Sequence, residues 1–258
     1  MRLTVIGSSG SVPGPASPSS SYLLEADDAD GRTWRVLLDA GSGALGVLQR
    51  FCDPRDLDAV LISHLHPDHC ADLAHLDTYL SYHPDGPAEP VTVYGPFGTA
   101  GRIAQLKGTD EHSAALPCVV WQASGHTRIG PMLVTVESVR HPVPAYAFRI
   151  EGPSEDPATA SAILTYSGDT DECDGLEVAA ADADVLLCEA SFLETDDAPE
   201  GLHLTGLAAG QVAERARAGR LILTHIPPWT DCPSVHAEAA SAYDGPIDLA
   251  HPGLRVEL

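Results

Sequence analysis

The densest group of residues that could perform chemistry lies in the string Ser-His-Leu-His-Pro-Asp-His, which begins at Ser63. It contains four potential metal ligands: His64, His66, Asp68 and His69. Burying these side chains in a core without partners would be costly. Imidazole nitrogens and carboxylate oxygens are, however, ligands that suit zinc and similar divalent ions. We therefore predict a metal site here, in preference to an exposed patch of histidines.

Three further potential ligands each follow a strand-like segment later in the chain. His141 follows Ser138–Arg140, Asp169 follows a strand ending at Tyr166, and His225 follows Leu221–Thr224. A single histidine after a strand is more often a structural or exposed residue than a ligand. Three such positions downstream of the first cluster favour a second set of ligands, and two metal ions need more ligands than the first cluster supplies.

Short apolar runs bounded by Gly, Pro or Asp predict the strands that position these residues. The predicted strands are Leu3–Ile6, Ser21–Glu25, Trp34–Leu38, Asp58–Ile62, Val91–Tyr94, Cys118–Gln122, Met132–Val136, Ala145–Ile150, Ala162–Tyr166, Val185–Cys188 and Leu221–Thr224. The predicted helices are Asp68–Ser81, Gly98–Leu106, Leu176–Ala181, Thr205–Ala218 and Val235–Tyr243. Two strand-rich stretches with interspersed helices predict sheets stacked between helical layers. The length fits one domain over residues 1–258.

The composition bears on the partners. The chain has 258 residues, with 37 acidic and 14 basic side chains and a formal charge of −23. Lys107 is its single lysine. This balance argues against nucleic acid, which is bound largely through Lys and Arg, and against anionic membranes. The apolar fraction of 44% suffices for a substantial core, in which we also expect Tyr82 and Phe97.

The cysteines and the N-terminal segment bear on location. Six cysteines without a C-x-x-C pair, in a chain of this length, are expected to be mostly buried thiols in a reducing cytosol. The apolar run Leu3–Ile6 is too short for the core of a signal peptide. No stretch approaches the ~20 apolar residues of a membrane span. A cytoplasmic protein is expected.

The ordered pattern H-x-H-x-D-H, His, G-D-T, T-H resembles the metallo-β-lactamase superfamily over nearly the whole chain. The resemblance implies an α/β fold, the four-layer αββα metallo-β-lactamase sandwich, with two divalent metal ions. Zinc is favoured, with manganese or iron as alternatives. The implied ligands are His64, His66 and His141 for one ion, Asp68, His69 and His225 for the other, and Asp169 as the bridge. Asp39, in Leu-Leu-Asp-Ala-Gly-Ser-Gly, would orient ligands from behind.

Further motifs narrow the branch. Asp169 stands where classical β-lactam hydrolases have Cys, which argues against that activity. Glu189, in Leu-Cys-Glu-Ala-Ser-Phe, and His203 resemble the RNase Z branch. There the pair implies that His203 protonates the leaving oxygen while Glu189 fixes its tautomer. Only 28 positions separate His141 from Asp169, so the long tRNA-binding arm of that branch does not fit.

The strings Gly-Ser-Ser-Gly-Ser-Val-Pro-Gly-Pro from Gly7 and Thr-His-Ile-Pro-Pro-Trp-Thr from Thr224 resemble a compact bacterial group with cyclic-nucleotide phosphodiesterase activity. The resemblance implies hydrolysis of a small phosphodiester, such as cAMP, by a metal-bound hydroxide, with Asp68 accepting its proton. Trp229 could stack on a base, although tryptophan after Pro-Pro is as often loop packing. The resemblance to this group also allows a homodimer.

Three alternatives stay open. An RNase Z-type tRNA 3′-processing endoribonuclease uses the same ligands but is disfavoured by the acidic charge and the missing arm. A broader hydrolase of aryl sulfates, cyclic phosphates or lactones would use the same site. A non-catalytic binding protein on this fold is disfavoured, because all the expected ligands are present.

Overall fold

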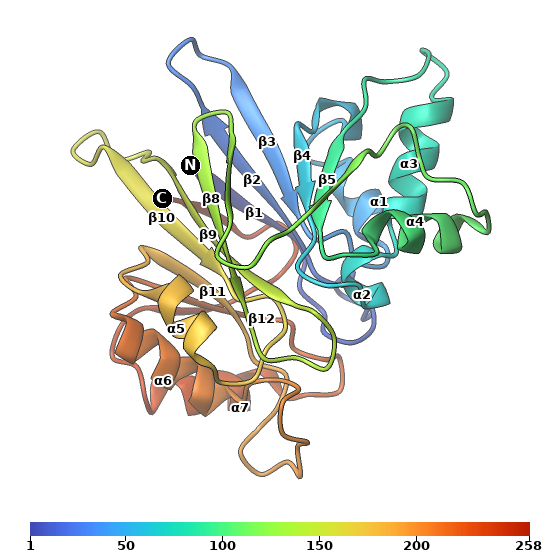
Figure 1. Cartoon of the computed structure of the whole chain (residues 1–258). Coiled ribbons are helices and arrows are strands. Elements are labelled where there is room, and N and C mark those ends of the chain that lie inside the picture. Colours follow the sequence, from blue (N-terminus) through green and yellow to red (C-terminus); the bar gives the residue numbers. More distant parts are fainter.

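The structure is a computed structural model that describes residues 1–258. Two seven-stranded sheets face each other (Figure 1). The first contains β1 (Arg2–Gly7), β2 (Ser21–Asp27), β3 (Thr33–Leu38), β4 (Ala59–Leu61), β5 (Thr92–Gly95), β6 (Cys118–Val120) and β14 (Arg255–Glu257). Its order is β14-β1-β2-β3-β4-β5-β6. Strands β14 to β3 pair antiparallel, and β3 to β6 pair parallel.

The second sheet repeats this design. It contains β7 (His126–Ile129), β8 (Met132–Ser138), β9 (Tyr146–Pro153), β10 (Ser161–Tyr166), β11 (Val185–Glu189), β12 (Leu221–Thr224) and β13 (Ile247–Leu249). The order is β13-β12-β11-β10-β9-β8-β7. Strands β7 to β10 pair antiparallel and β10 to β13 pair parallel. In both sheets the parallel strands therefore direct their carboxyl ends toward one edge, where side chains that follow them can converge.

Helices cover the outer face of each sheet (Figure 1). The first sheet carries α1 (Ala44–Leu48), α2 (Pro67–Cys70), α3 (Leu73–Tyr82) and α4 (Thr99–Lys107), with a short 3₁₀ helix at Pro54–Asp56. The second carries α5 (Asp174–Ala180), α6 (Gly206–Ala216) and α7 (Cys232–Ala240). None of these helices has the length and apolar character needed to cross a membrane.

Three apolar clusters hold the layers together. The largest has 25 buried residues and lies between the two sheets, where Tyr22 and Leu38 meet Phe148 and Tyr166. Clusters of 17 and 18 buried residues join the first and second sheets to their own helices. The four-layer αββα sandwich is thus confirmed, because each sheet is buried on both faces.

The helix expected over Asp68–Ser81 is instead two helices. The Asp72 amide donates to the Ala40 carbonyl at 2.9 Å, outside any helix, and its carboxylate accepts from the Leu45 amide at 2.8 Å. These bonds separate α2 from α3. Strands β7, β13 and β14 and helix α1 were not expected. The three strands, His-Thr-Arg-Ile, Ile-Asp-Leu and Arg-Val-Glu, lack the continuous apolar run that marks β4 and β6, and α1 has only five residues.

Two expectations about burial were wrong. Tyr82 and Phe97 are 80% and 87% exposed instead of packed in the core. Of the six cysteines, all of them free thiols, only Cys70 and Cys188 are buried. Apolar character alone did not place these residues, because α3 ends at Tyr82 and Phe97 precedes α4, so both lie in segments that turn out to solvent.

Candidate metal centre

The predicted site residues other than Trp229 lie at one edge of the sandwich, after the ends of strands. Asp39 follows β3 and the His64–His69 segment follows β4. The second sheet contributes His141 after β8, Asp169 after β10, Glu189 at the end of β11, and His225 after β12. The candidate ligands, which are up to 161 positions apart from His64 to His225, therefore share one site.

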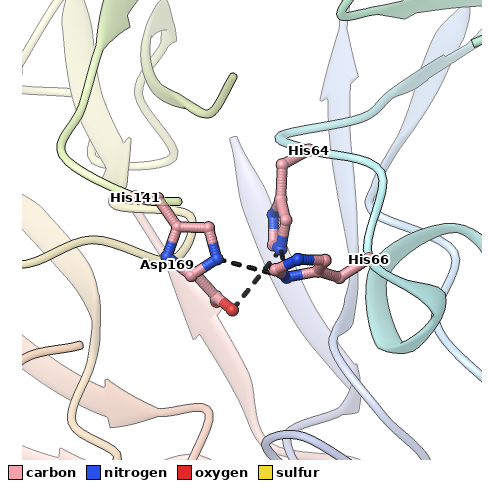
Figure 2. Close-up of side chains that lie close together, drawn as sticks. All are labelled: His64, His66, His141 and Asp169. Carbon is pink, nitrogen blue, oxygen red and sulfur yellow. Dashed lines mark hydrogen bonds and ion pairs between the residues drawn. The ribbon is translucent and has the colours of Figure 1, made fainter. Parts of the chain in front are cut away.

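The first ligand group consists of His64, His66, His141 and Asp169. Their ligand atoms all lie within 4.8 Å of one another. Figure 2 shows the three imidazole rings and the carboxylate directed toward a common point. His66 Nδ1 is 3.0 Å from His64 Nε2 and 3.2 Å from His141 Nε2. Burial lowers the pKa of all three histidines, which favours the neutral imidazole that a metal ion requires.

The second ligand group consists of Asp68, His69, Asp169 and His225, all buried. His225 Nε2 lies 3.1 Å from Asp68 Oδ2 and 3.3 Å from Asp169 Oδ2. Although burial would raise it, the surrounding histidines hold the pKa of the Asp169 carboxyl well below its usual value. Asp169 belongs to both groups, so the structure places it where a bridging ligand would stand.

Two atoms of the second group test whether a metal ion fits. His69 Nε2 and Asp169 Oδ1 are buried and make no hydrogen bond, although they are 3.1 Å apart. A buried polar atom without a partner is costly and needs an explanation. An imidazole nitrogen and a carboxylate oxygen facing each other in this way fit a divalent cation, which would satisfy both.

Asp39 supports this arrangement from behind. It is fully buried and adopts a left-handed backbone conformation, with φ of 55°. Its carboxylate accepts from the Ser63 amide and hydroxyl, both at 2.7 Å, and lies 2.7 Å from His69 Nδ1. Because a carboxylate only accepts, His69 Nδ1 must carry the proton, which leaves Nε2 free to face the ligand group.

Tyr166 was missed by the sequence reasoning. Its hydroxyl donates to Asp39 Oδ2 at 2.7 Å, across the interface between the two sheets. Burial, reinforced by the Asp39 carboxylate, raises the pKa of Tyr166 well above its ordinary value, so the phenol keeps its proton and donates. Its position three residues before Asp169 is the only signal, and tyrosines at strand ends are too common for that to be informative.

His203 and Glu189 form the predicted pair. His203 Nδ1 lies 2.8 Å from Glu189 Oε1, and the Thr170 amide donates to the same oxygen at 2.8 Å. Burial would lower the pKa of His203, but the Glu189 carboxylate outweighs it and raises the pKa to about 9. Glu189, His203 and His225 form a third close group, so the pair adjoins the second ligand group. This geometry can deliver a proton to a group bound there.

Ser191 is a further residue that the sequence reasoning missed. Its hydroxyl is 3.1 Å from Glu189 Oε2 and 2.9 Å from His225 Nδ1. It thereby ties the carboxylate behind His203 to a residue of the second ligand group. Trp229, by contrast, is 70% exposed and belongs to none of these groups.

Comparison with known proteins identifies the family of the chain. The Beta-lactamase superfamily domain matches residues 34–226. An uncharacterized protein of Mycobacterium leprae is 42% identical over 258 residues, which cover 98% of this chain and 87% of that protein. The probable metallo-hydrolase YhfI of Bacillus subtilis is 29% identical over 272 residues and 98% of both chains.

Solved structures share the fold. The crystal structure of YhfI from Bacillus subtilis has a TM-score of 0.85 at 27% identity. The alignment covers 100% of this chain and 98% of that chain. Human tRNase Z, short form, has a TM-score of 0.75 at 21% identity, covering 100% and 99% of the two chains. A diphosphatase of the PhnP family has a TM-score of 0.74 at 20% identity, covering 100% and 97%. The chain belongs to the beta-lactamase superfamily, and within it is a metal-dependent hydrolase.

Proposed function

We propose that this enzyme is a dinuclear metal-dependent phosphodiesterase that hydrolyses a small phosphodiester. The proposed substrate is a 3′,5′-cyclic nucleotide such as cAMP, and the product is the nucleoside monophosphate. The observation that carries the proposal is the Glu189–His203 pair beside two ligand groups that share Asp169. Cleavage of a phosphate ester needs charge neutralisation at phosphorus and a proton for the leaving oxygen. The site has residues for both. The names of two structural neighbours, tRNase Z and a diphosphatase, support chemistry at phosphorus.

Each side chain then has a defined task. His64, His66 and His141 would hold one ion, Asp68, His69 and His225 the other, and Asp169 both. Divalent ions in these positions, zinc in our proposal, would lower the pKa of a water molecule and neutralise the phosphoryl oxygens. Asp68 would accept the proton of the attacking water. His203, oriented by Glu189, would protonate the ribose 3′-oxygen as it leaves.

The interval between His141 and Asp169 supports a small substrate. It contains β9 and β10 joined by the short segment 154–160, and no inserted arm. The formal charge of −23 disfavours a long polyanion. Free thiols at all six cysteines support our proposal of a reducing, cytoplasmic setting.

An RNase Z-type endoribonuclease is the second candidate. It is favoured by the structural likeness to human tRNase Z, short form, and by the Glu189–His203 pair. A broader hydrolase of aryl sulfates, cyclic phosphates or lactones would use the same ligands. These three candidate functions differ in their substrates. The fold does not determine the substrate, so assays on different substrates are needed to separate them.

The test is a substrate panel combined with His203→Ala. Metal-loaded protein is assayed with zinc and with manganese against cAMP, 2′,3′-cyclic nucleotides, an aryl sulfate and a tRNA precursor. We expect cyclic nucleotides to be hydrolysed, and His203→Ala to lower kcat by about 10²–10⁴-fold with metal content unchanged. His112→Ala, an exposed histidine outside the site, is the control. Cleavage of the tRNA precursor alone would establish the endoribonuclease, and loss of metal in His203→Ala would refute its role as a proton donor.

A further inference from the structure

A cavity of about 400 Å³ is lined by Phe192, the residue whose ring contacts His203. Its walls come from two loops, the segment after β11 that begins at Phe192 and the turn that carries Trp229. The Phe192 ring meets the His203 ring edge-on, with centroids 5.5 Å apart. Phe192 therefore links the predicted proton donor to the wall of this cavity, within reach of a substituent on the oxygen that His203 would protonate.

Hydrogen bonds hold both walls in place. The Thr230 amide donates to the Pro227 carbonyl at 2.9 Å, which closes a turn with Trp229 near its tip. The Thr230 hydroxyl then donates to the Ser191 carbonyl at 3.3 Å and joins this turn to the other wall. Phe192 is fixed by backbone bonds to Leu204 and Gly206, both at 3.1 Å. These bonds fix the positions of Phe192 and of the turn that carries Trp229.

The chemistry of the lining restricts what could enter. Phe192, Leu193 and Trp229 offer apolar and aromatic surface, and three acidic residues, Asp196, Asp197 and Asp231, also line the cavity, with no basic side chain. Asp196 Oδ2 accepts from the Leu193 amide and Asp231 Oδ2 accepts from Ser234, which leaves one carboxylate oxygen of each for a ligand. Ionised carboxylates accept hydrogen bonds and donate none. A further phosphate would be repelled, whereas a flat, uncharged ring with amino groups would be accommodated.

We propose that this cavity binds the nucleoside of the substrate, with the base on Trp229 and its amino group directed to the carboxylates. This inference rests on the proposed function, because it assigns the part of a cyclic nucleotide that lies beyond the oxygen protonated by His203. Base–aromatic stacking tolerates any base. The carboxylates add a preference for amino-bearing bases, namely adenine, guanine and cytosine, over uracil.

The experiment compares cAMP with the base-free methyl riboside 3′,5′-cyclic phosphate in the metal-loaded enzyme. Trp229→Ala should raise the KM for cAMP by roughly tenfold or more, as expected for the loss of one stacked base, and should leave the base-free substrate unchanged. Trp229→Phe should restore much of the affinity. Because Trp229 is 70% exposed, its removal does not endanger folding. Tyr82→Ala, which removes another exposed aromatic side chain, should change neither substrate.

Calorimetric titration with adenosine gives a readout independent of turnover. Wild type should bind it, and Trp229→Ala should bind it at least several-fold more weakly. Asp197→Asn should reduce the preference for cyclic AMP over cyclic UMP. Equal KM values for cAMP in wild type and Trp229→Ala, or adenosine binding unaffected by Trp229→Ala, would overturn the proposal. If no phosphodiester is hydrolysed, the proposed function fails, and the adenosine titration still decides whether the cavity binds nucleosides.

Discussion

The two halves of the molecule have the same plan, yet they supply the site in different ways. In each half, antiparallel strands lead into parallel ones and helices cover the outer face. The first half provides four clustered side chains from one segment, His64–His69. The second half provides one side chain at a time, from the ends of β8, β10, β11 and β12 and from the loop that carries His203.

The difference shows where the precision of the site comes from. The segment after β4 is held by α2, which begins at Pro67 and places Asp68 and His69 on one short helix. In the second half each side chain depends on the register of its own strand, and the strands are aligned by the sheet. The ligands of the first half are thus positioned by one short segment, whereas those of the second half are positioned by the pairing of strands in the sheet.

The largest effect should come from the residue common to both ligand groups. Asp169→Ala should abolish binding of both ions and lower activity by several orders of magnitude, because each group loses a carboxylate oxygen. Metal content by mass spectrometry and phosphodiesterase assays measure this, with a thermal melt to confirm folding. If the variant keeps two ions at full occupancy, Asp169 is not the bridge between the halves.

A smaller effect is expected at Asp39, which orients the first half from behind. Asp39→Asn should lower metal affinity about 10–100-fold, because an amide cannot accept all the hydrogen bonds from Ser63, His69 and Tyr166. Competition with a chromogenic chelator measures it. Asp72→Asn, at another buried aspartate of the same half that bonds Leu45, is the matched control and should keep its affinity. Equal losses in both variants would indicate general destabilisation.

The smallest effect is expected from the hydrogen bond that joins the two halves, between Tyr166 and Asp39. Tyr166→Phe removes the hydroxyl that reaches from the second sheet to Asp39, and should weaken metal binding by roughly threefold to tenfold, the value of one hydrogen bond. Tyr22→Phe removes a nearby hydroxyl that bonds Thr224 instead, and should leave metal binding unchanged. An unchanged affinity in Tyr166→Phe would show that Ser63 and His69 suffice to hold Asp39 in place.

The same contrast explains how much could be predicted from the sequence. The cluster at His64–His69 can be recognised from spacing alone. His141, Asp169 and His225 could be proposed as ligands because each follows a strand. Their assignment to one ion or the other needed the ordered family pattern, because nothing in one strand shows which other strand end lies beside it. Tyr166 and Ser191 escaped both routes, since a hydroxyl has a role here only through atoms brought from elsewhere in the chain. The strand pattern predicted the layers, and it missed the edge strands β7, β13 and β14, because polar or charged residues interrupt the apolar run in each of them.

The pairing of the last strand with the first has a consequence for how the chain folds. Strand β14 pairs with β1, with Glu257 opposite Arg2, although β13 just before it belongs to the other sheet. During synthesis, the edge of β1 therefore stays open until β14 has been made, about 250 residues later. Contacts of such long sequence separation slow folding, and an open strand edge invites pairing with other chains. The completion of the first sheet, more than the assembly of the site, is expected to limit the yield of refolding at high protein concentration.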